Sequence, residues 1–120
     1  LQTIKAIQTI GNQGDGRFET WFDALEFMKS EIDKRDYDVC LLGCGAYGMP
    51  LAAHVKRSGK KAVHLGGSLQ LLFGIRGARW ENSNYNATYN YSKLMNEFWV
   101  KPSATETPSK AQQVEEGCYW

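Results

Sequence analysis

The sequence predicts an α/β fold built around a short parallel sheet, and three observations lead to this expectation. Short apolar runs typical of strands alternate with segments of helical periodicity over residues 1–74. A glycine-rich turn follows the second apolar run and leads directly into a helical segment. Another glycine turn follows the third run. The order strand–helix–strand–helix–strand–helix predicts a three-layer, Rossmann-like domain (βαβαβα).

The first predicted strand and helix occupy the N-terminal part of the chain. Thr3–Ile10 alternates well enough for a strand, and the composition of Gly11–Gly16 is that of a loop. Glu19–Arg35 carries apolar residues at the i, i+3, i+4, i+7 spacing of an amphipathic helix. Thr20 is placed to cap this helix, and Asp23 follows three residues later, as in a capping box.

The glycine turns lie between the next predicted elements. Asp38–Leu42 (DVCLL) reads as a buried parallel strand and Lys61–Leu65 (KAVHL) as its neighbour. Between them, Tyr47–Ser58 is predicted to be a helix, and Gly59 is well placed to end it. Ser68 follows the third strand and is placed to cap a third helix, which would continue through Phe73.

After residue 74 the composition changes. Ile75–Tyr91 is rich in Asn, Tyr, Arg and Gly and is predicted to be an ordered loop. Tyr91–Val100 is predicted to be a short helix, and residues 103–113 a polar surface arm. We therefore expect one domain, 1–120, with a core at 1–74 and a loop-and-helix extension at 75–120.

Composition argues against several classes of function. The 120 residues are 42% hydrophobic and 22% charged, as in an ordinary globular domain. A net charge of +1 argues against nucleic-acid binding, which usually requires a strongly basic face. No apolar run approaches the roughly 18 residues of a membrane-spanning helix, and no signal peptide opens the chain. The three cysteines are expected to be free thiols, so we expect a cytoplasmic protein.

The start of the sequence suggests a missing region. Leu1 is not a methionine, and the first ten residues already read as a core element. We therefore expect the chain to be a C-terminal fragment of a longer protein. A sheet left incomplete in this way tends to pair with another chain, so we also expect a homo-oligomer.

The clearest chemical motif is a glycine pattern between a predicted strand and a predicted helix. Gly43, Gly45 and Gly48 form GxGxxG in the sequence GCGAYG. The first glycine permits a tight turn, the second lets the backbone approach a phosphate, and the third lets helix and strand pack closely. The helix N-terminus then offers free N–H groups to an anion. The alternative is a glycine-rich turn with no ligand.

A second glycine turn, Gly66, Gly67 and Ser68, would lie beside the first if the two strands are neighbours. Together the turns would form a cleft suited to a diphosphate, and His64 could reach it. A histidine partly buried for structural reasons fits the sequence as well. An NAD-type oxidoreductase is disfavoured, because its ribose-binding Asp or Glu should end the strand that here ends in His64 and Leu65.

Two arginines follow the third predicted helix. Arg76 and Arg79 could bind phosphates bidentately, and Trp80 could stack on a base or sugar. The alternative is a solvated basic loop with Trp80 in the core. The sequence contains no Ser–His–acid set, no Cys–His set and no clear carboxylate pair. It therefore assigns no catalytic residue and predicts no metal site.

The stretch from Trp21 to Trp120 resembles a family of bacterial proteins, mostly uncharacterised, that is often found with surface-polysaccharide genes. The resemblance rests on residues 38–80 (DVCLLGCGAYGMPLAAHVKRSGKKAVHLGGSLQLLFGIRGARW), on NEFWVKPSATETP and on the final GCYW. That family is distantly similar to the GT-D type glycosyltransferases, in which a glycine-rich strand–turn–helix accompanies a nucleotide-sugar site. The resemblance therefore implies a Rossmann-like fold and a nucleoside diphosphate sugar as donor substrate.

Two features of the GT-D enzymes are missing from this sequence. The upstream segment resembling Arg-Phe-Gly-Asp-Gly-Glu is absent, and the sequence has Gly67-Ser68-Leu69-Gln70 where the acidic DxE metal motif would fall. We therefore expect the nucleotide-binding half of a glycosyltransferase-like protein, with a role in polysaccharide biosynthesis. In this interpretation the two glycine turns hold the phosphates, and the two arginines neutralise the diphosphate. The alternative function is a non-catalytic α/β binding or assembly module, whose glycine turns serve packing alone.

Overall fold

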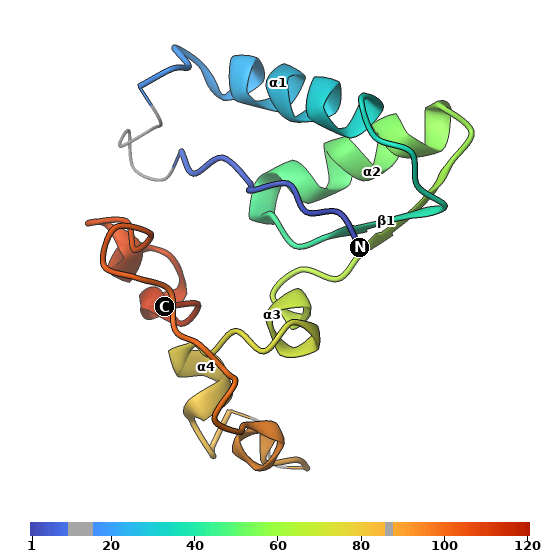
Figure 1. The fold of residues 1–120 in the computed structure, drawn as a ribbon. Coiled ribbons are helices and arrows are strands. Elements are labelled where there is room, and N and C mark those ends of the chain that lie inside the picture. Colours follow the sequence, from blue (N-terminus) through green and yellow to red (C-terminus); the bar gives the residue numbers. More distant parts are fainter. Residues whose placement is uncertain (10–15, 86–87) are drawn as a thin grey trace. The chain divides into compact units, whose positions relative to one another are not determined.

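A computed structural model describes residues 1–9, 16–85 and 88–120 (Figure 1). Most of the predicted loop Gly11–Gly16 and the last residue of the predicted strand Thr3–Ile10 lie outside the described residues. The chain forms two compact units, a first unit Leu1–Leu69 and a second unit Gln70–Trp120. The boundary lies five residues before the expected change at residue 74.

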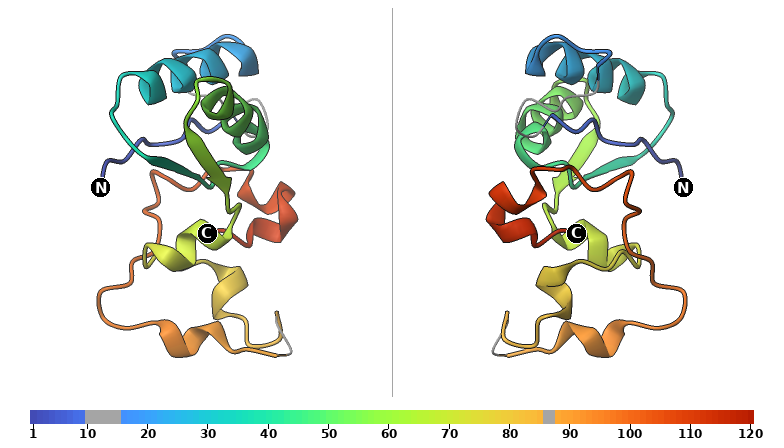
Figure 2. Two further views of the ribbon diagram at one scale, coloured as in Figure 1. Left: turned by 90° about the vertical axis from the view of Figure 1, so that its right-hand side faces the viewer. Right: turned by 90° about the vertical axis from the view of Figure 1, so that its left-hand side faces the viewer.

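The first unit contains the predicted parallel βαβ arrangement. Strands β1 (Val39–Leu42) and β2 (Lys61–His64) pair in parallel, with Val39 opposite Lys61 and Leu42 opposite His64. Helix α2 (Gly48–Arg57) connects them and packs against both strands (Figure 2). The Leu65 N–H donates to the Leu42 carbonyl at 2.8 Å and so extends the ladder toward the turns. Gly59 follows α2 with a φ of +82°, which confirms it as the residue that ends the helix.

Helix α1 (Trp21–Asp33) covers the outer side of α2 in Figure 1. The predicted capping box is confirmed, since Thr20 Oγ1 accepts from the Asp23 N–H and the Asp23 carboxylate accepts from the Thr20 N–H. Apolar residues of both helices and of β1 close the core of the first unit, namely Ala24, Leu25, Met28, Ile32, Leu42, Leu51 and Val55.

The first predicted strand is not formed by the described residues 1–9. Ile7 and its neighbour Ala6 both pack toward the core, so the two-residue alternation of a strand is lost. Side chains hold the segment instead: Gln2 Nε2 donates to the Asp36 carbonyl at 2.8 Å, and the Thr9 hydroxyl lies 2.8 Å from the Tyr47 hydroxyl. Without a third strand, the described residues build a two-stranded sheet, and the expected three-layer βαβαβα arrangement is not completed.

The two strands are buried on one face only. Leu42 is buried against α2, but Val39, Leu41 and Val63 expose 44%, 42% and 45% of their surface. The apolar run DVCLL was expected to be buried on both sides, as is usual for a parallel strand. In the described structure its outward-pointing residues Val39 and Leu41 are instead close to half exposed.

The second unit contains short helices and turns. Helix α3 (Ser68–Leu72) leads into it from the first unit; Ser68 is its first residue rather than its predicted cap, and the helix ends one residue before Phe73. Helix α4 (Ala78–Glu81) follows, and 3-10 turns lie at Tyr91–Leu94, Ala111–Gln113 and Glu115–Gly117. Ile75 and Val100 form an isolated parallel bridge. Within the described ranges, no helix is both long and apolar enough to cross a membrane.

The helix predicted at Tyr91–Val100 is wrong beyond its first turn. Only Tyr91–Leu94 is helical, as a 3-10 turn. The Asn96 side chain then accepts from the Phe98 N–H at 3.0 Å, and this local turn competes with helix formation. Val100 continues away from the turn and exchanges hydrogen bonds with Gly74 and Arg76.

The C-terminal residues are part of the fold of the second unit. The first N–H groups of α4, on Ala78 and Arg79, donate to the carbonyls of Trp120 and Cys118. The Gln70 side chain donates to the Tyr119 carbonyl at 2.9 Å and accepts from the indole of the buried Trp80 at 3.0 Å. The final GCYW therefore satisfies backbone groups that the four-residue helix α4 would otherwise leave unpaired.

Candidate functional site

The two predicted glycine turns lie side by side where β1 and β2 end. A Cβ atom added at Gly43 would lie 2.8 Å from the Gly66 carbonyl oxygen and 2.6 Å from Leu69 Cβ. Such a contact has no room for any side chain, so Gly43 is required where the first turn passes the second. The first glycine turn (Gly43–Gly48) and the second glycine turn (Gly66–Ser68) are therefore neighbours at the carboxyl edge of the sheet.

Two glycines in these turns adopt left-handed backbone conformations. Gly45 has a φ of +52° and Gly66 a φ of +55°, and a Cβ at either position would have no atom within 4 Å. Glycine is needed at both because of the backbone conformation rather than crowding. The space within 4 Å of each Cβ position is free of other atoms, so no side chain lies directly against these two glycines.

Several peptide N–H groups of the turns have no backbone acceptor within the described residues. The N–H of Tyr47 is used by the Cys44 carbonyl, and those of Ser68 and Leu69 by the carbonyls of Leu65 and Gly66. By contrast, the described residues provide no backbone acceptor for the other amides of the two turns, which are those of Gly43, Cys44, Gly45, Ala46, Gly66 and Gly67. Amides grouped in this way attract anions.

The third glycine of the motif lies against the imidazole of His64. A Cβ at Gly48 would lie 2.1 Å from His64 Nε2, so the helix can approach the strand only because residue 48 has no side chain. This is the packing role that the motif predicts for its third glycine. His64 Nε2 is buried and, within the described structure, has no hydrogen-bond partner.

Aromatic stacking holds the first turn in place. The chain enters α2 through a 3-10 turn, Gly45–Tyr47, whose Tyr47 is buried. The Tyr47 ring stacks on Trp21 of α1, with ring centroids 4.7 Å apart and planes 6° from parallel. The backbone around the open amides is therefore anchored to the core, which reduces the conformational entropy that ligand binding would cost.

Arg76 and Arg79 belong to the second unit, where each has a carboxylate partner. Arg76 Nη2 lies 2.5 Å from Glu81 Oε1, and Lys101 Nζ lies 2.7 Å from the other oxygen of the same carboxylate. Arg79 pairs with Glu115. Glu115 gave no signal in the sequence, because it is 36 residues from Arg79.

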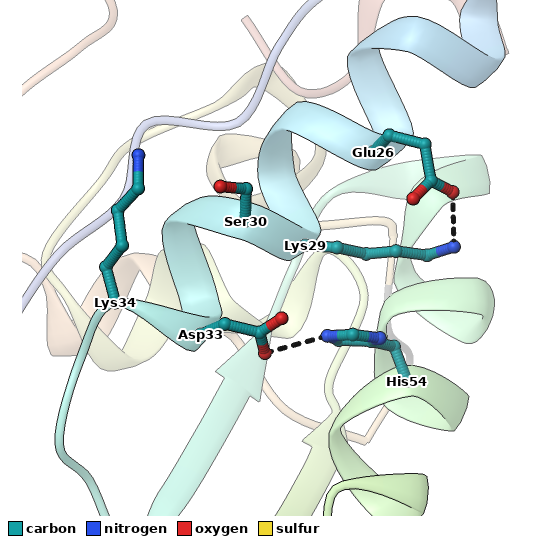
Figure 3. Close-up of a pocket in the computed structure, with 6 residues that line it drawn as sticks. All are labelled: Glu26, Lys29, Ser30, Asp33, Lys34 and His54. Carbon is teal, nitrogen blue, oxygen red and sulfur yellow. Dashed lines mark hydrogen bonds and ion pairs between the residues drawn. The ribbon is translucent and has the colours of Figure 1, made fainter.

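Sequence reasoning also missed a polar depression between α1 and α2 (Figure 3). In this depression the His54 and Asp33 side chains point toward each other, and His54 Nε2 lies 2.8 Å from Asp33 Oδ1. Lys29 is paired with Glu26 at 2.6 Å. The depression measures about 420 Å³ and is lined by Glu26, Lys29, Ser30, Asp33, Lys34 and His54. Both lysines already have carboxylate partners, so the depression offers no unpaired ammonium to an anion.

The three cysteines are free thiols. Burial, and to a smaller extent the nearby Cys40, raises the pKa of the Cys44 thiol to about 11. Burial also raises the pKa of Cys40 and of Cys118. A thiol that stays protonated at neutral pH is a poor nucleophile, so these side chains are unsuited to covalent catalysis.

Metal-ligating side chains do not gather in the described part of the chain. Residues 1–9, 16–85 and 88–120 contain no group of three or more His, Cys, Asp or Glu placed to hold a metal ion. Searches for relatives found no family model, curated protein or solved structure that matches this chain. The description of the glycine-turn site therefore rests on the geometry of this chain alone.

Proposed function

We propose that the first unit binds the phosphates of a nucleoside diphosphate, or of a nucleotide sugar, at the two glycine turns. The observation that carries this proposal is the set of amides on Gly45, Ala46, Gly66 and Gly67, which have no backbone acceptor within the described structure. They lie on adjacent turns at the carboxyl edge of a parallel sheet, where ligands of open α/β sheets bind. Phosphate oxygens would supply the missing acceptors.

Within this proposal, the chain is the nucleotide-binding half of a glycosyltransferase-like protein that acts in the cytoplasm in surface polysaccharide biosynthesis. That role follows from the resemblance of residues 38–80 and of the final GCYW. The donor would be a nucleoside diphosphate sugar. Arg76 and Arg79 belong to the second unit and have carboxylate partners there, so this site of the first unit is proposed without them. No side chain is assigned to the chemical step.

Titration with UDP tests the proposal directly. We expect the amide resonances of Gly45, Ala46, Gly66 and Gly67 to shift, and calorimetry to yield a dissociation constant. Gly45→Val should weaken binding by roughly tenfold or more, because its side chain would fill the space now open beside the turn.

Gly59→Val is the matched control. Gly59 also has a positive φ and open space at its Cβ position, but it ends α2 and does not lie in a glycine turn. Both variants carry a comparable backbone strain, so both should lose stability. Only Gly45→Val should lose affinity for UDP. Equal affinity of the two variants would show that UDP binds elsewhere.

A second candidate function is an assembly module without catalysis. The observation that favours it is the exposed apolar face of the sheet, formed by Val39, Leu41 and Val63. Parallel sheets are normally covered on both faces, so a second copy of the chain could supply the missing cover. In that case the glycine turns would serve packing, and UDP would leave their amide resonances unchanged.

A further inference from the structure

The Arg79 guanidinium has several polar and aromatic contacts within the second unit. Its side chain is only 14% exposed. Nη1 donates to the Tyr119 hydroxyl at 2.9 Å, and Nη2 donates to the Glu115 carboxylate. The guanidinium carbon lies 4.5 Å from the ring centroid of Tyr119 and 4.9 Å from that of Tyr85. Two tyrosines thus fix the position of the cation.

One N–H donor of this guanidinium has no acceptor. Arg79 Nε is buried and has no hydrogen-bond partner within the described structure. Nε and Nη2 lie on one edge of the guanidinium, and an oxyanion that faces this edge can accept from both. Among the guanidinium donors, Nη2 is the one that donates to Glu115, whose carboxylate also accepts from the Tyr119 hydroxyl at 3.3 Å and from the Cys118 thiol at 3.8 Å. The carboxylate therefore uses only part of the hydrogen-bonding capacity of a site that a phosphate group could fill.

The carboxylate is supplied by a strained turn. Glu115 has a φ of +46° and Glu116 a φ of +56°, although neither is glycine. A residue held in this region costs on the order of 1–3 kcal/mol. The Glu115 side chain is 55% exposed, so water could solvate it if the turn relaxed and the carboxylate left Arg79. Its departure would leave Nη2 without its acceptor, beside the unpaired Nε.

We propose that Arg79 is a binding site for the diphosphate of a nucleotide, and that Glu115 is its internal occupant, which the ligand displaces. The C-terminal turn then competes with the ligand and sets its apparent affinity. The proposal rests on the proposed function only for the identity of the ligand. The site itself is defined by the guanidinium, its two tyrosines and its single carboxylate.

The test compares Glu115→Gln with the unchanged protein in titrations with UDP and with inorganic pyrophosphate. Glutamine keeps the size of the side chain but removes the charge, so it competes less well for the guanidinium. We expect UDP to bind Glu115→Gln at least roughly fivefold more tightly, with a shift of the Arg79 Nε resonance. Adding Arg79→Lys to Glu115→Gln should abolish the gain, because lysine cannot bind bidentately. Pyrophosphate should show the same gain if the phosphates alone are recognised, and a smaller one if the nucleoside contributes.

Glu116→Gln is the matched control. Glu116 shares the positive φ and the negative charge of its neighbour, but it does not contact Arg79 in the described structure. It should leave the affinity for UDP unchanged. An equal gain in Glu116→Gln and Glu115→Gln would overturn the proposal, because it would reflect net charge rather than competition at Arg79.

The remaining outcomes separate this proposal from the proposed function. If UDP shifts the glycine-turn amides but Glu115→Gln binds no more tightly, the competition proposal fails and the proposed function stands. If UDP shifts only the Arg79 Nε resonance, the proposed function fails and the competition proposal stands. If UDP shifts neither, both fail. Should Glu115→Gln unfold, Glu115→Asp keeps the charge but retracts the carboxylate by one methylene, and the absence of a gain there would also overturn the competition.

Discussion

At Gly48 the fold depends on the absence of a single methyl group. The imidazole of His64 occupies the space into which a Cβ would project, with Nε2 only 2.1 Å from that position. Both partners are held by regular structure, because Gly48 begins α2 and His64 ends β2. A Cβ at residue 48 would require the imidazole to rotate away or the helix to shift from the strand. We therefore expect this contact to limit how closely α2 approaches the sheet.

Gly48→Ala should lower the free energy of unfolding by about 1–3 kcal/mol, which is typical of overpacking. Urea denaturation followed by tryptophan fluorescence measures this change. Gly16→Ala is the control, because a Cβ at Gly16 meets nothing within 4 Å and should change stability by less than about 0.5 kcal/mol. His64→Ala should relieve the effect of Gly48→Ala in a double-mutant cycle. Additive effects would argue that the two residues do not clash.

The sequence predicted the roles of these glycines better than it predicted their neighbours. The GxGxxG spacing places Gly48 where a helix must approach a strand. It does not identify His64 as the contact, because that depends on the register of β1 and β2, which pairs Leu42 with His64. Likewise, the positive φ of Gly45 follows from a known type of turn, whereas the contact between Gly43 and Leu69 depends on the neighbouring strand.

Among the elements, those specified by local sequence were predicted well. Helix α1 has both its amphipathic periodicity and its capping box within a few residues, and the structure contains both. The segment at residues 3–10 could not be judged locally, because a strand exists only if a partner backbone pairs with it. At Tyr91–Val100, the apolar spacing favoured a helix, but the Asn96 side chain satisfies the Phe98 N–H in a turn instead.

Glu81, the last residue of α4, is held by charged side chains from both sides of the helix in the sequence, Arg76 and Lys101. Glu81 accepts from Lys101 Nζ at 2.7 Å and from Arg76 Nε at 2.7 Å. The hydrogen bond from Lys101 is the main cause that holds the pKa of Glu81 below its ordinary value; burial opposes it, and the weaker hydrogen bond from Arg76 adds to it. Because the folded pKa is the lower one, this contribution is fully present above the unfolded pKa. It is lost as the pH falls through the folded pKa.

We therefore expect the stability of the second unit to fall as the pH drops below about 4.5, the ordinary pKa of Glu81. Glu81→Gln should reduce this pH dependence, because the neutral side chain has no proton to gain. Glu97→Gln is the control, since Glu97 contacts neither Arg76 nor Arg79 in the described residues. Urea denaturation at a series of pH values gives, for each protein, the slope of the free energy of unfolding against pH. Equal slopes for all three proteins would mean that Glu81 does not contribute.

On the scale of the whole molecule, the apolar residues left uncovered bear on assembly. The exposed residues Val39, Leu41 and Val63 lie in register on one face of the sheet, with Leu41 paired to Val63. A two-stranded sheet has little stability of its own, so its outer face is a natural contact for another chain. The sequence could not show which face of the sheet would remain open, because that depends on the packing of α1 and α2.

If a second copy covers this face, Leu41→Lys should weaken self-association at least roughly tenfold, since the interface would have to bury an unpaired charge. Sedimentation equilibrium over a range of protein concentrations measures the association constant. Phe22→Lys is the matched control: Phe22 is 69% exposed in the same unit but lies on α1, away from the sheet face, and its substitution should leave association unchanged. A monomer at every concentration would rule out the oligomer, and equal weakening by both substitutions would place the contact elsewhere. A dimer that survives Leu41→Lys would leave the exposed strand residues without a role in assembly.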